Sequence, residues 1–77
     1  MDPKVMAYFA AGIGAALTII GSATGIGRLA GAAVEGIARQ PNAAGDIRGV
    51  AVLLAGFIEG VTFFSLIICM LLVLMMR

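Results

Sequence analysis

The chain has 77 residues, of which 62% are hydrophobic, and its formal net charge is +1. This hydrophobic share is far above that of a soluble domain, and a chain this short cannot build a large core by itself. The near-neutral charge excludes the strongly basic footprint of a nucleic-acid-binding protein. With no histidine and a single cysteine, Cys69, we expect no metal site of the usual zinc kind and no intrachain disulfide.

The first predicted element is a helix over residues 4–39. Pro3 suits the first turn of a helix, and the uncharged apolar run 5–27 has 23 residues, enough to cross a bilayer. Glu35 and Arg39 stand four residues apart, which favours continued helix. A secretory signal sequence is the alternative for this run, but its apolar core is typically about 7–15 residues long.

A polar connection at 40–45 follows, and a second helix is predicted at 46–76. Pro41 disfavours helix at the residue before it, and we expect Asp46 to be the N-cap of the second helix. Apart from one acid, the run 49–76 is uncharged, and its 28 residues span a bilayer with length to spare. The sequence therefore predicts an all-α membrane protein, one unit over 1–77, folded as an antiparallel hairpin of two transmembrane helices.

Small residues crowd the first helix, which includes the glycine pairs Gly21 with Gly25 and Gly27 with Gly31. Glycine inside a helix is costly unless close backbone approach compensates, so this helix is expected to pack tightly against others. Packing within one hairpin is the simpler interpretation, but the small residues cover more than one helical face. Because the large side chains gather in the second helix, we expect hairpins to assemble into a closed homo-oligomeric ring with the first helix inside.

Glu59 is the only charged residue in the run 49–76. A charged side chain at the centre of a membrane helix costs roughly 2.5–3.5 kcal/mol on insertion scales, and such residues usually mark proton or ion pathways. We expect the carboxyl to be protonated when it faces lipid and to ionise when it faces water or a cation. The alternative is a permanently protonated carboxyl that donates a structural hydrogen bond between helices.

A hairpin centred near residues 42–43 would place Glu59 level with about Ile26 of the first helix. Glycines on both helices would leave space around the carboxyl at this level. The predicted surroundings of the acid are Gly25, Ile26, Gly27, Phe57, Gly60, Thr62, Phe63 and Phe64. Arg28 lies two residues past Ile26, faces elsewhere on the helix, and is expected at the lipid head groups.

Over essentially its whole length, the chain resembles the proteolipid, or rotor-ring c protein, of F-type ATP synthases. The resemblance rests on the segment 34–41 (VEGIARQP), the segment 45–47 (GDI), Glu59 and the glycines of the first helix. Ala23 stands where many members have another glycine, a change that small-residue packing tolerates.

The resemblance implies a rotor ring in the membrane. In this ring, Glu59 loads and releases the coupling ion beside an arginine of subunit a, which belongs to the stator. It implies that the loop residues Arg39, Gln40 and Pro41 contact the central stalk of the catalytic head. The chain itself would be non-catalytic, without nucleotide or other cofactor, and its remaining partners would be membrane lipids and no nucleic acid. It also places the loop on the cytoplasmic side of a bacterial plasma membrane.

The expected coupling ion is the proton. Sodium-type relatives carry a glutamine on the first helix level with the acid, a hydroxyl residue directly after the acid, and a tyrosine five residues beyond it. These positions are Ile26, Gly60 and Phe64 here, and none of these side chains offers an oxygen to a sodium ion. A proton needs only the carboxyl and one acceptor, such as a backbone carbonyl near Phe57 or a water molecule.

Three alternatives remain open from the sequence. The hairpins could form an oligomeric proton channel or antiporter, although this alternative leaves the loop 39–41 without a role. They could also form a sodium-coupled version of the same rotor. A passive membrane-packing protein would keep its function after Glu59→Gln. Because positive residues are balanced between the loop and the termini, charge does not set the orientation. We expect a bacterial plasma membrane rather than an organelle, because no leader precedes the first run.

Overall fold

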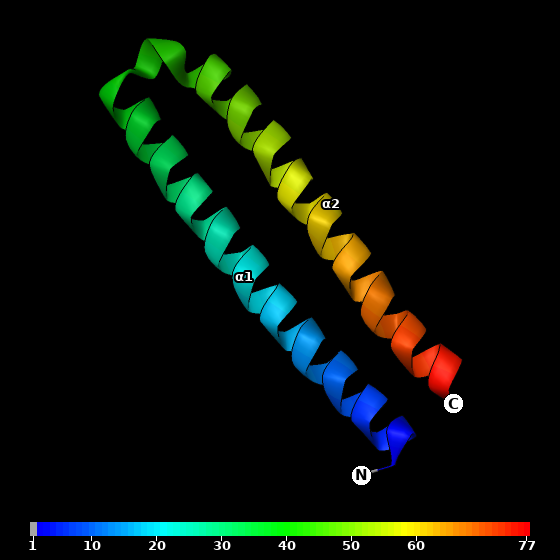
Figure 1. Ribbon diagram of the computed structural model, residues 1–77. Helices are drawn as coiled ribbons and strands as arrows, with labels where there is room; N and C mark the ends of the chain where they lie inside the picture. The colour runs from blue at the N-terminus through cyan, green and yellow to red at the C-terminus, as the bar shows by residue number, and fades with distance from the viewer. Residues whose placement is uncertain (1) are drawn as a thin grey trace.

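A computed structural model describes residues 2–77, which form an antiparallel pair of helices (Figure 1). Helix α1 covers Pro3–Arg39, a 3-10 turn η1 covers Pro41–Ala43, and helix α2 covers Ala44–Met76. Both helices are long and apolar enough to cross a membrane. The two ends of the chain lie together, opposite the turn. The predicted fold class, an all-α hairpin of two transmembrane helices, is therefore confirmed.

Residues beside each end of α1 satisfy its terminal backbone groups. Asp2 is the N-cap, and its carboxylate accepts a hydrogen bond of 2.9 Å from the backbone N–H of Lys4. Pro3 occupies the first turn as predicted, where its missing N–H costs nothing. At the other end, the N–H of Gln40 donates to the carbonyl of Gly36 over 2.9 Å. The helix thus ends directly before Gln40 and Pro41.

The connection between the helices is shorter than predicted. Ala44 and Gly45, expected in the loop, are the first two residues of α2. The prediction that Asp46 caps this helix is wrong, because the N-cap position is Ala43 and Asp46 lies in the first turn. The reason is η1, in which the N–H of Ala43 donates to the carbonyl of Gln40 over 2.9 Å and leads the chain straight into α2. Asp46 still lies at the positive end of the helix dipole.

Four contacts fix the register of α1 against α2. The pairs are Gly36 with Ile47, Gly25 with Ile58, Thr18 with Ser65, and Gly14 with Cys69. The two residue numbers of each pair add to 83, so the helices stay in step along the hairpin. Glu59 is therefore level with Thr24, and not with Ile26 as predicted. The difference arises because the tight turn moves the centre of the hairpin toward the first helix.

The hairpin has almost no interior. Ala11, with 6% of its surface exposed, is the only buried residue among those described. The two helices approach closely because their contact face carries small residues; a Cβ atom on Gly14 would lie 3.1 Å from the Sγ atom of Cys69. The resulting body is a thin plate with extents of 58 × 16 × 8 Å.

The exposed surfaces of the two helices carry side chains of different size. One exposed stripe of α1 carries small residues at a helical spacing, namely Gly12, Ala16, Ala23 and Gly27, although large side chains such as Ile20 and Val34 are exposed elsewhere on this helix. Large exposed apolar side chains cover α2, including Phe57 at 62% exposure and Val61 at 72%. Apolar surfaces of this extent require lipid or protein to cover them.

Candidate functional site

The hairpin has two flanks, on either side of the line where the helices touch. Flank A is the side on which the following residues lie together: Leu17 and Gly21 of α1, and Phe57 and Val61 of α2. Flank B is the side on which a different set lies together: Ile26 and Ala30 of α1, and Val52 and Ala55 of α2. The distinction decides which residues one hairpin can place around its acid.

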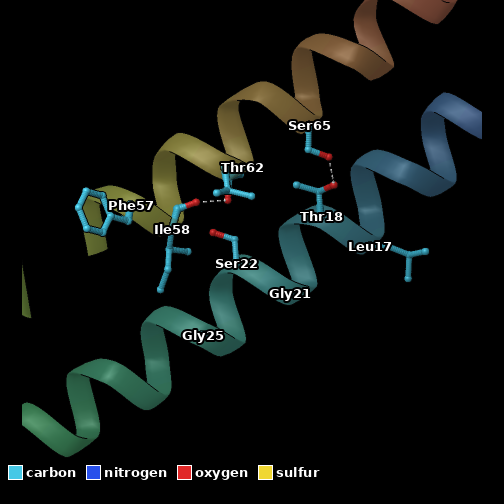
Figure 2. Close-up of a pocket in the computed structure, with 10 residues that line it drawn as sticks. Leu17, Thr18, Gly21, Ser22, Gly25, Phe57, Ile58, Thr62 and Ser65 are labelled. Carbon is cyan, nitrogen blue, oxygen red and sulfur yellow. Dashed lines mark hydrogen bonds between the residues drawn. The ribbon is translucent and has the colours of Figure 1, made fainter. Parts of the chain in front are cut away.

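Flank A contains an apolar groove of about 480 Å³, and the polar side chains that line it all carry hydroxyls (Figure 2). The hydroxyl oxygens of Thr18 and Ser65 share a hydrogen bond of 2.6 Å between the helices. The hydroxyl of Thr62 donates to the carbonyl of Ile58 in its own helix over 2.8 Å. Ser22 points toward α2 beside them (Figure 2). The groove is therefore a patch of hydroxyls between two apolar helices.

Glu59 lies on flank B, away from this groove. It follows Ala55 by one helical turn and Val52 by two turns, and therefore shares their face. The residue is exposed, and within residues 2–77 it makes no side-chain hydrogen bond. Its carboxyl is thus offered to whatever covers the hairpin, and it does not link α1 to α2 in the manner of a structural donor.

The predicted surroundings of the acid are divided between the two flanks. Ile26 is half-buried on flank B, and Gly60 is exposed directly beside Glu59. Phe57 and Thr62 line the groove on flank A instead. A single hairpin therefore brings Ile26 toward the side of the acid and turns Phe57 away from it, whereas Thr62, three residues after Glu59, is half-buried at the helix contact.

The other four predicted neighbours are also spread around the hairpin. Gly25 lies in the helix contact, where an added Cβ would be 3.6 Å from Ile58, whereas an added Cβ on Gly27 would meet no atom within 4 Å. Phe63 and Phe64 are both exposed, and their ring centroids are 6.5 Å apart in an edge-to-face arrangement. None of them encloses the carboxyl within one hairpin.

Sequence reasoning did not single out Thr18, Ser22 or Ser65. Thr18 and Ser22 are one turn apart on α1, and Thr62 and Ser65 are one turn apart on α2. Each pair is a short polar stripe on an apolar helix. This stripe is the sequence signal that could have revealed the groove, and the register that joins the two stripes comes only from the structure.

The predicted stalk-contact residues lie together at the tip of the hairpin. Arg39 is the last residue of α1, Gln40 follows as its C-cap, and Pro41 opens η1. All three are exposed, and with Asn42 and Asp46 they line a polar hollow. The tip thus presents a polar surface beyond the two apolar helices.

Two helices of membrane length, a polar tip and a single carboxyl in the middle of an apolar run are the features of a small hairpin membrane protein with one candidate ion-binding residue. A family model that describes the C subunit of ATP synthase matches residues 9–72. The chain is 49% identical over 61 residues to the ATP synthase c subunit of Phocaeicola vulgatus, covering 79% of this chain and 73% of that protein. The corresponding protein of Nostoc sp. is 46% identical over 74 residues, covering 94% of this chain and 91% of its own length.

The chain therefore belongs to the family of ATP synthase C subunits. Its place is in the rotor ring of the membrane sector of an F-type ATP synthase, as the resemblance implied. A membrane location agrees with the two apolar helices.

Proposed function

We propose that Glu59 is the carboxyl that loads and releases the coupling ion of the rotor, and that this ion is the proton. The observation that carries the proposal is the placement of Glu59, the one charged residue in 49–76, exposed on flank B without a hydrogen bond inside the described hairpin. A neutral carboxyl tolerates lipid, whereas water or a cation favours the ionised form. Alternation between these surroundings couples proton transfer to rotation of the ring.

The residues beside Glu59 on its own hairpin support the proton over sodium. A sodium ion that leaves water needs several oxygen ligands in place of its hydration shell. Ile26, Val52 and Ala55 on flank B have no side-chain oxygen, and the hydroxyl of Thr62 is bonded to the carbonyl of Ile58. Proton transfer requires only the carboxyl and one acceptor.

We also propose one protein partner for Glu59 and another for the tip of the hairpin. A cationic side chain of subunit a, in the stator, would meet Glu59 at the rim of the ring. The central stalk would rest on Arg39, Gln40 and Pro41. The exposed polar tip supports the second contact. The chain would itself be non-catalytic, and its tip would face the cytoplasm of a bacterium, since the relatives described above are bacterial.

Replacing Glu59 with glutamine in the assembled complex tests the role of the carboxyl. Glutamine keeps the shape of the side chain but cannot release a proton, so we expect intact rings whose proton-driven ATP synthesis falls to the uncoupled background. ATP synthesis in liposomes under an imposed pH gradient gives the readout, and Glu59→Asp, which keeps a carboxyl, should retain measurable synthesis. Normal synthesis by Glu59→Gln would overturn the assignment, and proton leak through the isolated wild-type ring would indicate a channel.

Labelling of the purified ring with a hydrophobic carbodiimide tests the identity of the ion. Such reagents attack protonated carboxyls in apolar surroundings, so we expect selective modification of Glu59 that declines as the pH rises. Addition of sodium chloride should change the labelling no more than addition of potassium chloride. Protection by sodium alone would show that a sodium site exists in the assembled ring and that the proton assignment is wrong.

A further inference from the structure

The two flanks carry opposite charges at the same height along the hairpin. Glu35 stands five full turns from Leu17 and therefore lies on flank A. Arg48 lies on flank B, where it lines a shallow hollow with Ile26 and Val52. The residue numbers of Glu35 and Arg48 add to 83, as in the contacting pairs of the two helices. A carboxylate on one flank is thus level with a guanidinium on the other.

A second pair of charges repeats this complementarity deeper in the helices. Arg28 lies on flank A, two turns from Gly21, and Glu59 lies on flank B, level with Thr24. Arg28 and Glu59 therefore differ in height by four residues, or about 6 Å. A helical arginine leans toward the N-terminus of its helix, which here is toward the height of Glu59. From the middle of the hairpin to its tip, flank A carries a positive charge and then a negative charge. Flank B carries a negative charge and then a positive charge.

None of these four charges meets its opposite within the described part of one hairpin. All four residues are exposed, and Glu35 forms no ion pair with Arg39 although the two are one turn apart. Charged side chains on apolar helices usually pair with one another or face water. Because the chain belongs to a ring, the surface that each flank meets first is the flank of another copy.

We propose that neighbouring copies in the ring pack flank A against flank B, with an ion pair between Glu35 of one copy and Arg48 of the next. Packing of like flanks would instead oppose Glu35 to Glu35 and Arg48 to Arg48, and it could not close a ring, which requires head-to-tail contacts. The inference rests on ring membership and is independent of which ion Glu59 carries.

Paired cysteines test which residues meet between copies. In a Cys69→Ala background, Glu35→Cys and Arg48→Cys are combined, and intact rings are oxidised in membranes and separated on a denaturing gel. We expect a ladder of dimers, trimers and larger species, because each chain is linked to both neighbours. The matched control combines Glu35→Cys with Val50→Cys, since Val50 lies at nearly the same height but on flank A, and should give no ladder. No ladder in the test pair, or an equal ladder in the control pair, would overturn the proposal.

Exchange of the two charges tests the ion pair itself. Glu35→Arg alone and Arg48→Glu alone should each lower the temperature at which the ring dissociates in detergent, and the combination of both should restore it. Dissociation unaffected by either single change, or a loss that the combination does not restore, would overturn the proposed pair. These measurements do not involve proton transfer, so they remain informative whatever the outcome for Glu59→Gln.

Discussion

At the scale of single residues, the hydrogen bond between Thr18 and Ser65 joins the side chains of α1 and α2 in the middle of the apolar surface. We expect Thr18→Val, which keeps the shape and removes the hydroxyl, to weaken the hairpin, because interhelical hydrogen bonds in membranes contribute about 0.6 kcal/mol on average. Titration of the hairpin with a denaturing detergent, followed by circular dichroism, would measure this loss. Combination with Ser65→Ala should cost less than the sum of the two single changes.

Thr62 provides the matched control for this prediction. Its hydroxyl is bonded to the carbonyl of Ile58 in the same helix, so Thr62→Val removes a hydroxyl from the same groove without breaking a bond between helices. We expect Thr62→Val to leave the pairing of α1 with α2 unchanged. Equal losses for Thr18→Val and Thr62→Val would indicate that burial of hydroxyls, and not the bond between helices, stabilises the pair.

The identity of the candidate site residue could be predicted from the sequence, whereas its surroundings could not. Glu59 is conspicuous because it is the one charge in a long apolar run, and that property needs no coordinates. The neighbours of Glu59 depend on the helical register, which a shift of two residues moved from Ile26 to Thr24. They also depend on flank, and one chain cannot reveal which residues a second copy brings to flank B.

At the scale of helices, the contact between Gly14 and Cys69 sets the closeness of α1 and α2 near the chain ends. We expect Gly14→Ala to destabilise the isolated hairpin, because the added Cβ would lie 3.1 Å from the Sγ atom of Cys69 and overpacking typically costs about 1–3 kcal/mol. The control is Gly12→Ala, where an added Cβ meets nothing within 4 Å. There, the higher helix propensity of alanine should stabilise the hairpin by up to about 1 kcal/mol.

Detergent unfolding of the isolated hairpin measures both glycine variants. Opposite signs for Gly14→Ala and Gly12→Ala are the expected result, and a loss of similar size in both would contradict the contact described for Gly14. The assembled ring gives a separate reading, because Gly12 lies in the exposed small-residue stripe of α1. Impaired assembly by Gly12→Ala, together with a more stable hairpin, would show that copies of α1 contact one another there.

The extents of the helices were predictable because long apolar runs have few alternatives to membrane-length helices. The turn was harder to predict. Pro41 correctly marks the end of α1, but Asp46 has the side chain of an N-cap and lies inside the first turn of α2. A residue that suits a cap also suits the first turn, where its charge interacts with the helix dipole. The sequence alone does not separate these two positions.

At the scale of the molecule, the thin plate of 58 × 16 × 8 Å explains why the chain is an assembly unit. With Ala11 alone buried among the described residues, the hairpin lacks a core that could hold it in water. Lipid can cover the large side chains of α2, and the small-residue stripe of α1 suits close contact with other copies of α1. Dependence on a ring is thus a property of the packing, and the family relationship gives that ring its place in the ATP synthase.

In the ring, the small-residue stripe of α1 would let copies of α1 approach one another more closely than copies of α2, and such a difference would curve a row of hairpins. The degree of this curvature would set the circumference of the ring and hence the number of copies in it. Because each copy would bring one ion-loading Glu59 in the mechanism that we propose, the number of copies would equal the number of protons carried in one revolution. In the motor that we propose, the side-chain volume of α1 would therefore set the number of protons carried for each ATP made.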